Sequence, residues 1–222
     1  MTSERAVPRL HVLIVDDHPI VRRGLADLIA EQADLAVCGE AATVAAALSL
    51  VSDRQPDVVI VELWLGPENG LDVVAGIAAA HPGVRSLVLS AHDERLYAGR
   101  ALTAGASGYI MKGQDCGELL AAIRRVGAGK TWVSDRVADG ILSGLNGRHG
   151  GGEPPLSRLT DRERQVLMLV GRGLGTSEVA RQLTLSVKTV ESHYAHLKVK
   201  LGLRNGRDLM RYAVSLAEAP GD

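Results

Sequence analysis

The 222-residue sequence has no phenylalanine, and aromatic residues make up only 3% of it. We therefore expect aliphatic and alanine contacts to form the core. The two cysteines, Cys38 and Cys116, lack the spacing of metal ligands or of a disulfide framework, which favours reduced thiols. No apolar run approaches the roughly 18 residues that a membrane span requires, and the N-terminus lacks a signal-type apolar segment. These absences predict a cytoplasmic protein without a membrane partner.

A formal net charge of -1 conceals two halves of opposite sign. Residues 1–126 hold 11 Lys and Arg against 16 Asp and Glu, a net charge of -5. Residues 157–217 hold 11 against 5, a net charge of +6. The chain is long enough for two small domains, and the basic one is the better candidate for binding nucleic acid.

Apolar runs with strand character recur through the first half, and polar residues stand where each run ends. The run 10–15 is followed by Asp16 and Asp17, and the run 58–61 is followed by Glu62. The run 84–89 is followed by Ser90, and a fourth run ends in Tyr109-Ile-Met-Lys112. Polar residues confined to the carboxyl ends of strands indicate a parallel sheet with a site along one edge.

Segments with helical periodicity alternate with these strands. They cover residues 19–29, 43–53, 70–80, 93–104 and 115–126. Together with a short strand at 37–40, they predict an α/β doubly wound domain with a parallel five-stranded sheet.

The predicted domain organisation has three parts. The first domain covers 1–128, a linker covers 129–156, and a second domain covers 157–222. Within the linker, residues 134–145 have the pattern of a helix. The Gly- and Pro-rich stretch 146–155 has the composition of a flexible tether.

The second domain is predicted to be all-α, with four helices. Thr160 and Glu163 have the spacing of a capping box, which opens a helix that runs to about Arg172. A glycine-containing break precedes a short helix at 177–183, and Ser186 caps a longer helix that reaches Leu201. A short helix, a tight turn and a longer helix form a helix-turn-helix.

Both halves are similar to known families. Asp16, Asp17, Ser90, Tyr109 and Lys112 match the acidic pair, hydroxyl, aromatic residue and lysine of the receiver domain of two-component response regulators. The segments Leu159-Thr-Asp-Arg-Glu-Arg-Gln-Val-Leu, Glu178-Val-Ala-Arg-Gln-Leu, Lys188-Thr-Val-Glu-Ser-His193 and Lys200-Leu-Gly-Leu203 resemble a LuxR-type DNA-binding domain. The whole chain therefore resembles NarL/FixJ-type response regulators.

The resemblance implies a non-enzymatic transcription regulator that binds double-stranded DNA as a homodimer, with a sensor histidine kinase as a possible partner. It places Glu62 where the family has its phosphoacceptor Asp. It implies that Mg²⁺ would be held by Asp16, Asp17, Glu62 and the Trp64 carbonyl. Ser90, Tyr109 and Lys112 would form the switch, in which the hydroxyl follows the site and the aromatic ring turns inward.

Glu62 departs from the family pattern. Its extra methylene displaces the carboxylate by about 1.5 Å, and a misplacement of about 1 Å at a reacting centre costs on the order of 100-fold in rate. Our hypothesis is that Glu62 is a poor or inactive phosphoacceptor and that its charge partly imitates a phosphate. Locked-on, locked-off and ligand-switched receivers all remain open.

The long helix of the second domain is the predicted recognition helix. Its periodicity places Val187, Val190, Tyr194, Leu197 and Leu201 toward the core. The candidate DNA contacts to bases, backbone and phosphates are Lys188, Thr189, Glu191, Ser192, Ala195, His196, Arg181, Lys198, Lys200 and Arg204. An apolar stripe on the last helix, formed by Leu209, Tyr212, Ala213 and Leu216, resembles the dimerising helix of the family.

Three alternatives stand beside this interpretation. In the first, the receiver would be a module that binds a protein or a ligand, and DNA binding would be secondary. In the second, an acid next to Glu62 would be phosphorylated as in a conventional receiver. A third possibility is an Asp-based phosphatase that uses Asp16 or Asp17, but this leaves the basic domain without a role.

Overall fold

A computed structural model describes residues 9–145, 156 and 158–218. The chain divides into two compact units, Met1–Arg148 and His149–Asp222, and each is described by itself. The predicted tether at 146–155 lies outside the described residues. None of the helices in the described part is both long and apolar enough to cross a membrane.

The first unit contains the predicted parallel five-stranded sheet, and its strand order is β2-β1-β3-β6-β7. Its strands are β1 (Leu10–Val15), β2 (Leu35–Ala41), β3 (Val58–Val61), β6 (Arg85–Ser90) and β7 (Gly108–Met111). All pairings are parallel, so the carboxyl ends of β1, β3, β6 and β7 meet along one edge.

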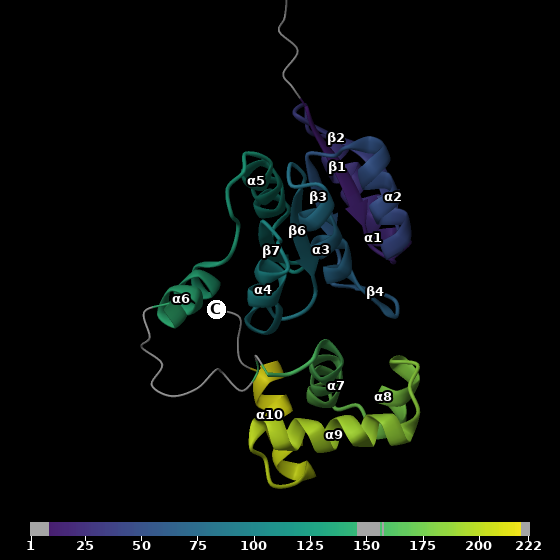
Figure 1. The fold of residues 1–222 in the computed structure, drawn as a ribbon, viewed down its shortest axis with the longest axis vertical. Helices are drawn as coiled ribbons and strands as arrows, with labels where there is room; N and C mark the ends of the chain where they lie inside the picture. Colours follow the sequence, from purple (N-terminus) through teal and green to yellow (C-terminus); the bar gives the residue numbers. More distant parts are fainter. Residues whose placement is uncertain (1–8, 146–155, 157, 219–222) are drawn as a thin grey trace, which may run out of the picture. The chain divides into compact units, whose positions relative to one another are not determined.

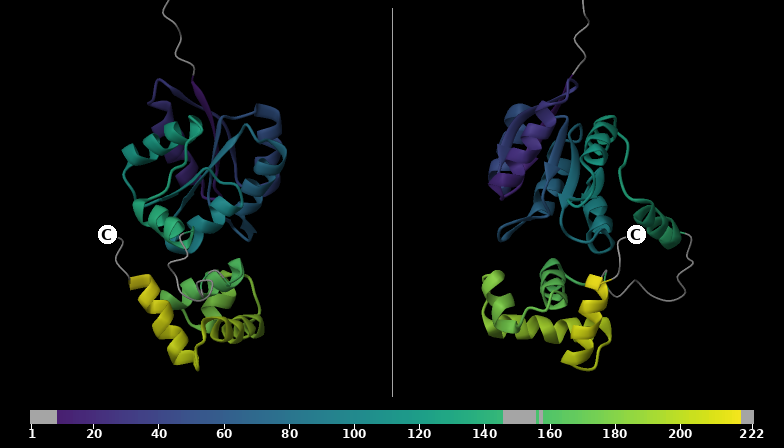
Figure 2. Two further views of the ribbon diagram at one scale, coloured as in Figure 1. Left: turned by 60° about the vertical axis from the view of Figure 1, so that its left-hand side comes forward. Right: turned by 180° about the vertical axis from the view of Figure 1, so that it is seen from behind.

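Helices enclose both faces of the sheet, as the two views of Figure 2 show. They are α1 (Pro19–Ala30), α2 (Val44–Arg54), α3 (Gly70–Ala80), α4 (Glu94–Thr103) and α5 (Cys116–Gly127). Because successive strand residues point to opposite faces, Val12 and Ile14 of β1 pack in one cluster with α1 and α5 residues such as Ile29 and Ile123. Most residues of β1, β3, β6 and β7 are buried, which explains why the sequences of these strands are almost continuously apolar.

A small antiparallel hairpin follows β3 and was not predicted. It is formed by β4 (Trp64–Leu65) and β5 (Glu68–Asn69). Gly66 turns the chain with φ +61°, and Gly70 lets α3 start directly against β3, since a Cβ there would lie 1.9 Å from the Glu62 carbonyl oxygen. The hairpin thus stands immediately beside the carboxyl edge of the sheet.

The chain after α5 returns to the edge strand β7. The Trp132 carbonyl accepts a hydrogen bond from the Tyr109 amide at 2.9 Å, and Gly108 permits this approach because a Cβ there would lie 2.6 Å from the Trp132 oxygen. The next helix, α6 (Asp135–Leu145), packs against α4. There the Ser134 hydroxyl donates to Glu94 Oε1 at 2.7 Å.

The second unit is all-α, as predicted, and Figure 1 labels its helices. They are α7 (Asp161–Gly171), α8 (Thr176–Gln182), α9 (Val187–Leu201) and α10 (Gly206–Glu218). The predicted capping box of Thr160 and Glu163 is present at the start of α7, and the Ser186 hydroxyl caps α9 by accepting from the Thr189 amide at 3.0 Å. Helices α8 and α9 form the expected helix-turn-helix.

Candidate functional site

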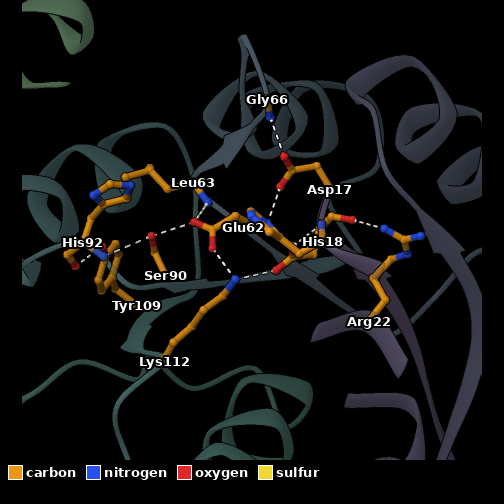
Figure 3. A network of polar contacts seen from close by, with 11 residues as sticks. Asp17, His18, Arg22, Glu62, Leu63, Gly66, Ser90, His92, Tyr109 and Lys112 are labelled. Carbon is orange, nitrogen blue, oxygen red and sulfur yellow. Dashed lines mark hydrogen bonds and ion pairs between the residues drawn. The ribbon is translucent and has the colours of Figure 1, made fainter. Parts of the chain in front are cut away.

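The carboxyl edge of the sheet gathers the polar residues that follow the strands (Figure 3). Glu62 directly follows β3 and is only 7% exposed. Its Oε1 accepts hydrogen bonds from the Leu63 amide and the Ser90 hydroxyl, both at 2.6 Å. Its Oε2 lies 2.5 Å from Lys112 Nζ. Both oxygens of this buried carboxylate therefore have partners among the described residues.

Lys112 bridges two acids. Its Nζ lies 2.5 Å from Asp16 Oδ2 as well as from Glu62 Oε2, and both carboxylates are almost fully buried. Burial alone lowers the pKa of Lys112, but the hydrogen bonds to Asp16 and Glu62 outweigh this and raise the pKa above its ordinary value. The ammonium group is therefore charged at neutral pH and serves as the counter-ion of the site.

The two acids after β1 have different surroundings. Asp16 Oδ1 accepts from the His18 amide at 2.8 Å, whereas Asp17 Oδ2 accepts from the Gly66 amide of the hairpin at 3.0 Å. His18 Nδ1 lies 2.8 Å from Asp17 Oδ1 and 3.2 Å from Asp16 Oδ1. Sequence reasoning missed His18 as a member of the site. The position of His18 directly after the acidic pair was the available signal.

Ser90, His92 and Tyr109 extend the network away from Glu62 (Figure 3). The Ser90 oxygen accepts from the His92 amide at 3.3 Å, and the Tyr109 hydroxyl donates to the His92 carbonyl at 2.7 Å. Tyr109 is 1% exposed, and burial raises its pKa well above 10.0. The ring is thus turned inward, and the β6–α4 loop joins it to the Ser90 hydroxyl.

The expected Mg²⁺ ligands do not converge on one point. The group of described residues whose ligand atoms lie within 4.8 Å of one another consists of Asp16, Asp17 and His18, without Glu62. The Glu62 carboxylate is committed to Ser90, Leu63 and Lys112, and Trp64 takes part in the hairpin. Mg²⁺ is usually held by one or two carboxylates together with water molecules, so Asp16 and Asp17 could supply its protein ligands while Glu62 pairs with Lys112, and Mg²⁺ binding stays a prediction.

An apolar groove lies behind the site, between α1 and α5. Its volume is about 420 Å³, and its wall includes Val21, Leu25 and Leu119 together with Lys112 and Cys116. Gly24 also lines it, with nothing within 4 Å of a Cβ built there. No pattern in the sequence indicated this groove.

The second unit presents most of the predicted DNA contacts at its surface. The exposed residues are Arg181, Lys188, Glu191, Ser192, Ala195, His196 and Arg204, and the partly buried ones are Thr189, Lys198 and Lys200. Val190 and Leu197 are fully buried as predicted, and Tyr194 and Leu201 pack against the same core. The prediction for Val187 was wrong: its side chain is 43% exposed, because it occupies the first turn of α9.

Contacts within the second unit bear on two further predictions. Lys200 lies 2.7 Å from the Glu163 carboxylate, which is 3% exposed and also accepts from the Thr160 amide, and its contact with a DNA phosphate stays a prediction. On α10, Leu209 and Ala213 are each 2% exposed within the core of their own unit. They are therefore not available for dimerisation, and Met210, 41% exposed, is the large apolar residue that faces outward there.

Both units of the chain match known protein families. Residues 12–124 match the family described as the response regulator receiver domain, and residues 157–213 match the bacterial regulatory proteins of the luxR family. DevR/DosR of Mycobacterium tuberculosis, described as a DNA-binding transcriptional activator, is 36% identical over 215 residues, which cover 95% of this chain and 98% of that protein. The oxygen regulatory protein NreC of Staphylococcus aureus is 35% identical over 210 residues, 92% of this chain and 97% of that protein.

Solved structures give the same result. A LuxR-family two-component response regulator from Aurantimonas is 34% identical with a TM-score of 0.58, over 62% of this chain and 99% of that one. RcsB of Salmonella enterica serovar Typhimurium, bound to a promoter in the presence of the phosphomimetic BeF₃⁻, is 25% identical with a TM-score of 0.59, over 93% of this chain and 99% of that one.

Proposed function

The chain belongs to the LuxR-type, DNA-binding transcriptional response regulators, and we propose that its receiver works without phosphorylation because Glu62 holds the signalling arrangement. The main observation that supports this proposal is the 2.6 Å hydrogen bond from the Ser90 hydroxyl to Glu62 Oε1. A permanent carboxylate takes the place of the charge that a phosphorylated Asp would introduce.

The direction of the effect follows from Ser90 and Tyr109. In the family, the hydroxyl moves toward the charged acceptor, and the aromatic ring turns inward. Here the hydroxyl already donates to Glu62, and the Tyr109 ring is already buried with its own hydroxyl on the His92 carbonyl. This arrangement corresponds to a receiver that is switched on permanently.

The proposal includes independence from Mg²⁺. Phosphoryl transfer needs a metal to bridge oxygens and neutralise charge, whereas a receiver that holds a fixed carboxylate does not. Lys112 already neutralises part of the charge of Asp16 and Glu62 from 2.5 Å. A sensor kinase is then not required for output.

The output of the proposed regulator is binding to double-stranded DNA through α9, as a homodimer on two half-sites. DevR/DosR is described as a DNA-binding activator, and a solved RcsB structure contains two dimers bound to two parallel DNAs. The exposed face of α9 and the flanking Arg181 and Arg204 supply polar and basic side chains for such contacts.

The test compares the full chain with Glu62→Asp and Glu62→Gln variants, each with and without acetyl phosphate. Intact mass reports phosphorylation, and titration with promoter DNA reports affinity. For the native chain we expect no added phosphate and no change in DNA affinity. The Glu62→Asp variant should gain a phosphate, and its DNA affinity should change when acetyl phosphate is added. Glu62→Gln removes the charge and retains the shape, so it should lower DNA affinity by about tenfold.

Asp57→Asn is the matched control. Asp57 is an exposed acid just before β3, and its contact with the His11 amide can be kept by an asparagine oxygen. This variant should behave like the native chain. Efficient labelling of the native chain on any receiver acid, accompanied by tighter DNA binding, would refute the proposal and favour conventional phosphorylation.

A second candidate is a receiver that responds to a small apolar ligand. The observation in its favour is the groove of about 420 Å³ between α1 and α5, because the stem of Lys112 forms part of its wall. A ligand there would reach the counter-ion of Glu62. Filling the groove with Gly24→Leu should abolish such a response and leave a permanently active receiver unaffected.

A further inference from the structure

Glu191 is an unusual side chain for a surface that faces a polyanion. It is exposed in the second turn of α9, one helical turn after the exposed Val187 and one before the exposed Ala195. No ion pair to Glu191 is found among the described residues, although Lys188 stands three positions earlier on the same helix. Its carboxylate is therefore not neutralised by a cation among the described residues of the second unit.

The surroundings of Glu191 restrict what it can contact. Val187 and Ala195 have no hydrogen-bonding side chain, and the Ser192 hydroxyl donates back to the Lys188 carbonyl at 3.0 Å. A carboxylate brought against DNA is repelled by phosphates, so it needs a hydrogen-bond donor on a base. In the major groove only the amino groups of cytosine and adenine provide one.

Cytosine is the better match of the two. Adenine presents its N6 donor beside the N7 acceptor, a pair that suits an amide side chain, whereas a carboxylate has no hydrogen to offer N7. The N4 amino group of cytosine is the usual partner of an acidic side chain.

We infer that Glu191 is a specificity-determining residue that reads one cytosine in each half-site through its N4 amino group. The inference rests on the proposed binding of DNA by α9. Glu191 lowers the general affinity of the surface for phosphates, and it selects sites in which a cytosine donor compensates for that repulsion. Glu191 thus lowers the affinity of α9 for DNA in general and increases its discrimination between DNA sequences.

The experiment selects binding sites from random double-stranded DNA with the full chain and with Glu191→Gln and Glu191→Ala. The native chain should enrich cytosine at one position of each half-site, by about tenfold over the other bases. Glu191→Gln should change the enriched base to adenine, because a glutamine amide pairs with N6 and N7. Glu191→Ala should bind unselected DNA more tightly and lose the preference at that position.

Glu178→Gln is the control with the same charge change. Glu178 accepts from the Gly175 amide at 2.8 Å at the start of α8, and a glutamine oxygen can keep this cap. The selected motif should stay unchanged in this variant. A motif that is identical in the native chain and both Glu191 variants would overturn the inference and leave the proposed function intact. Absence of any selected motif would overturn both.

Discussion

Each unit contains a lysine held by a buried glutamate, but the two pairs are built differently. Lys112 is shared by Glu62 and Asp16, and Glu62 needs it because two carboxylates are buried together. Lys200 serves Glu163 alone, and Glu163 also accepts hydrogen bonds from the amide and hydroxyl of Thr160. The first lysine compensates a concentration of charge, whereas the second reinforces a helix cap. Removal of the lysine should therefore cost the receiver more than the helical unit.

The largest effect is expected for Lys112→Ala. It leaves two buried carboxylates without their cation, and breaking a buried pair in this way costs about 3–5 kcal/mol. Both tryptophans of the chain, Trp64 and Trp132, lie in the first unit, so their fluorescence during urea unfolding measures this unit. Lys130→Ala, at an exposed lysine of the same unit, should change stability by less than about 0.5 kcal/mol. Equal losses for the two variants would contradict the described role of Lys112.

Glu163→Ala should have the next largest effect. It removes the capping box of α7 and leaves Lys200 without its partner, which together should cost about 2–3 kcal/mol. Glu163→Gln retains the cap and loses only the charge, so about 1 kcal/mol is expected. Far-UV circular dichroism of the full chain should show the loss, while tryptophan fluorescence should stay unchanged. A fluorescence shift as large as the dichroism shift would show that the effect is not confined to this unit.

The same pair predicts a dependence on pH. Burial raises the pKa of Glu163, but the hydrogen bonds from Lys200 and Thr160 outweigh it and lower the pKa below 4.5. Because the folded-state pKa is depressed, this stabilisation is complete above about pH 4.5 and is lost as the pH falls through the folded-state value. Dichroism-monitored stability should fall more steeply below pH 4.5 in the native chain than in Glu163→Gln. Parallel curves for the two proteins would exclude this contribution.

The smallest effect is expected for Tyr109→Phe, which removes one hydrogen bond to the His92 carbonyl and should cost about 1 kcal/mol. The raised pKa of Tyr109 adds a second signature. Its stabilisation is present below about pH 10 and is lost as the pH rises further, because the unfolded tyrosine then ionises first. Urea unfolding followed by fluorescence should show that the free energy of unfolding falls less steeply above about pH 10 in the variant than in the native chain. The same decrease in both proteins would show that other groups cause it.

Much of the receiver could be predicted because its strands are short apolar runs that end in polar residues. Parallel pairing of the strands then brings Asp16, Glu62, Ser90 and Lys112 to one edge of the sheet, independently of the loop conformations. The choice of contacts at that edge was not predictable. Periodicity does not tell which oxygen of Glu62 meets Ser90, or that Lys112 lies between two acids.

Two contacts in the second unit could not be predicted, for a common physical reason. An apolar stripe shows that a helix is covered, but not by what, so the sequence suggested a dimer surface for Leu209 and Ala213 although they fill the core of their own unit. The sequence around Lys200 likewise does not reveal its ion pair with Glu163. Glu163 is 37 positions before Lys200, and only the packing of α7 on α9 brings them together.

The return of the chain to β7 at Trp132 also affects how the receiver meets other molecules. An open edge strand presents free amide groups that pair readily with foreign strands. The Tyr109 amide is already bonded to the Trp132 carbonyl, and a side chain at position 108 would collide with that carbonyl. Gly108 therefore protects this border of the sheet against unintended strand addition and aggregation.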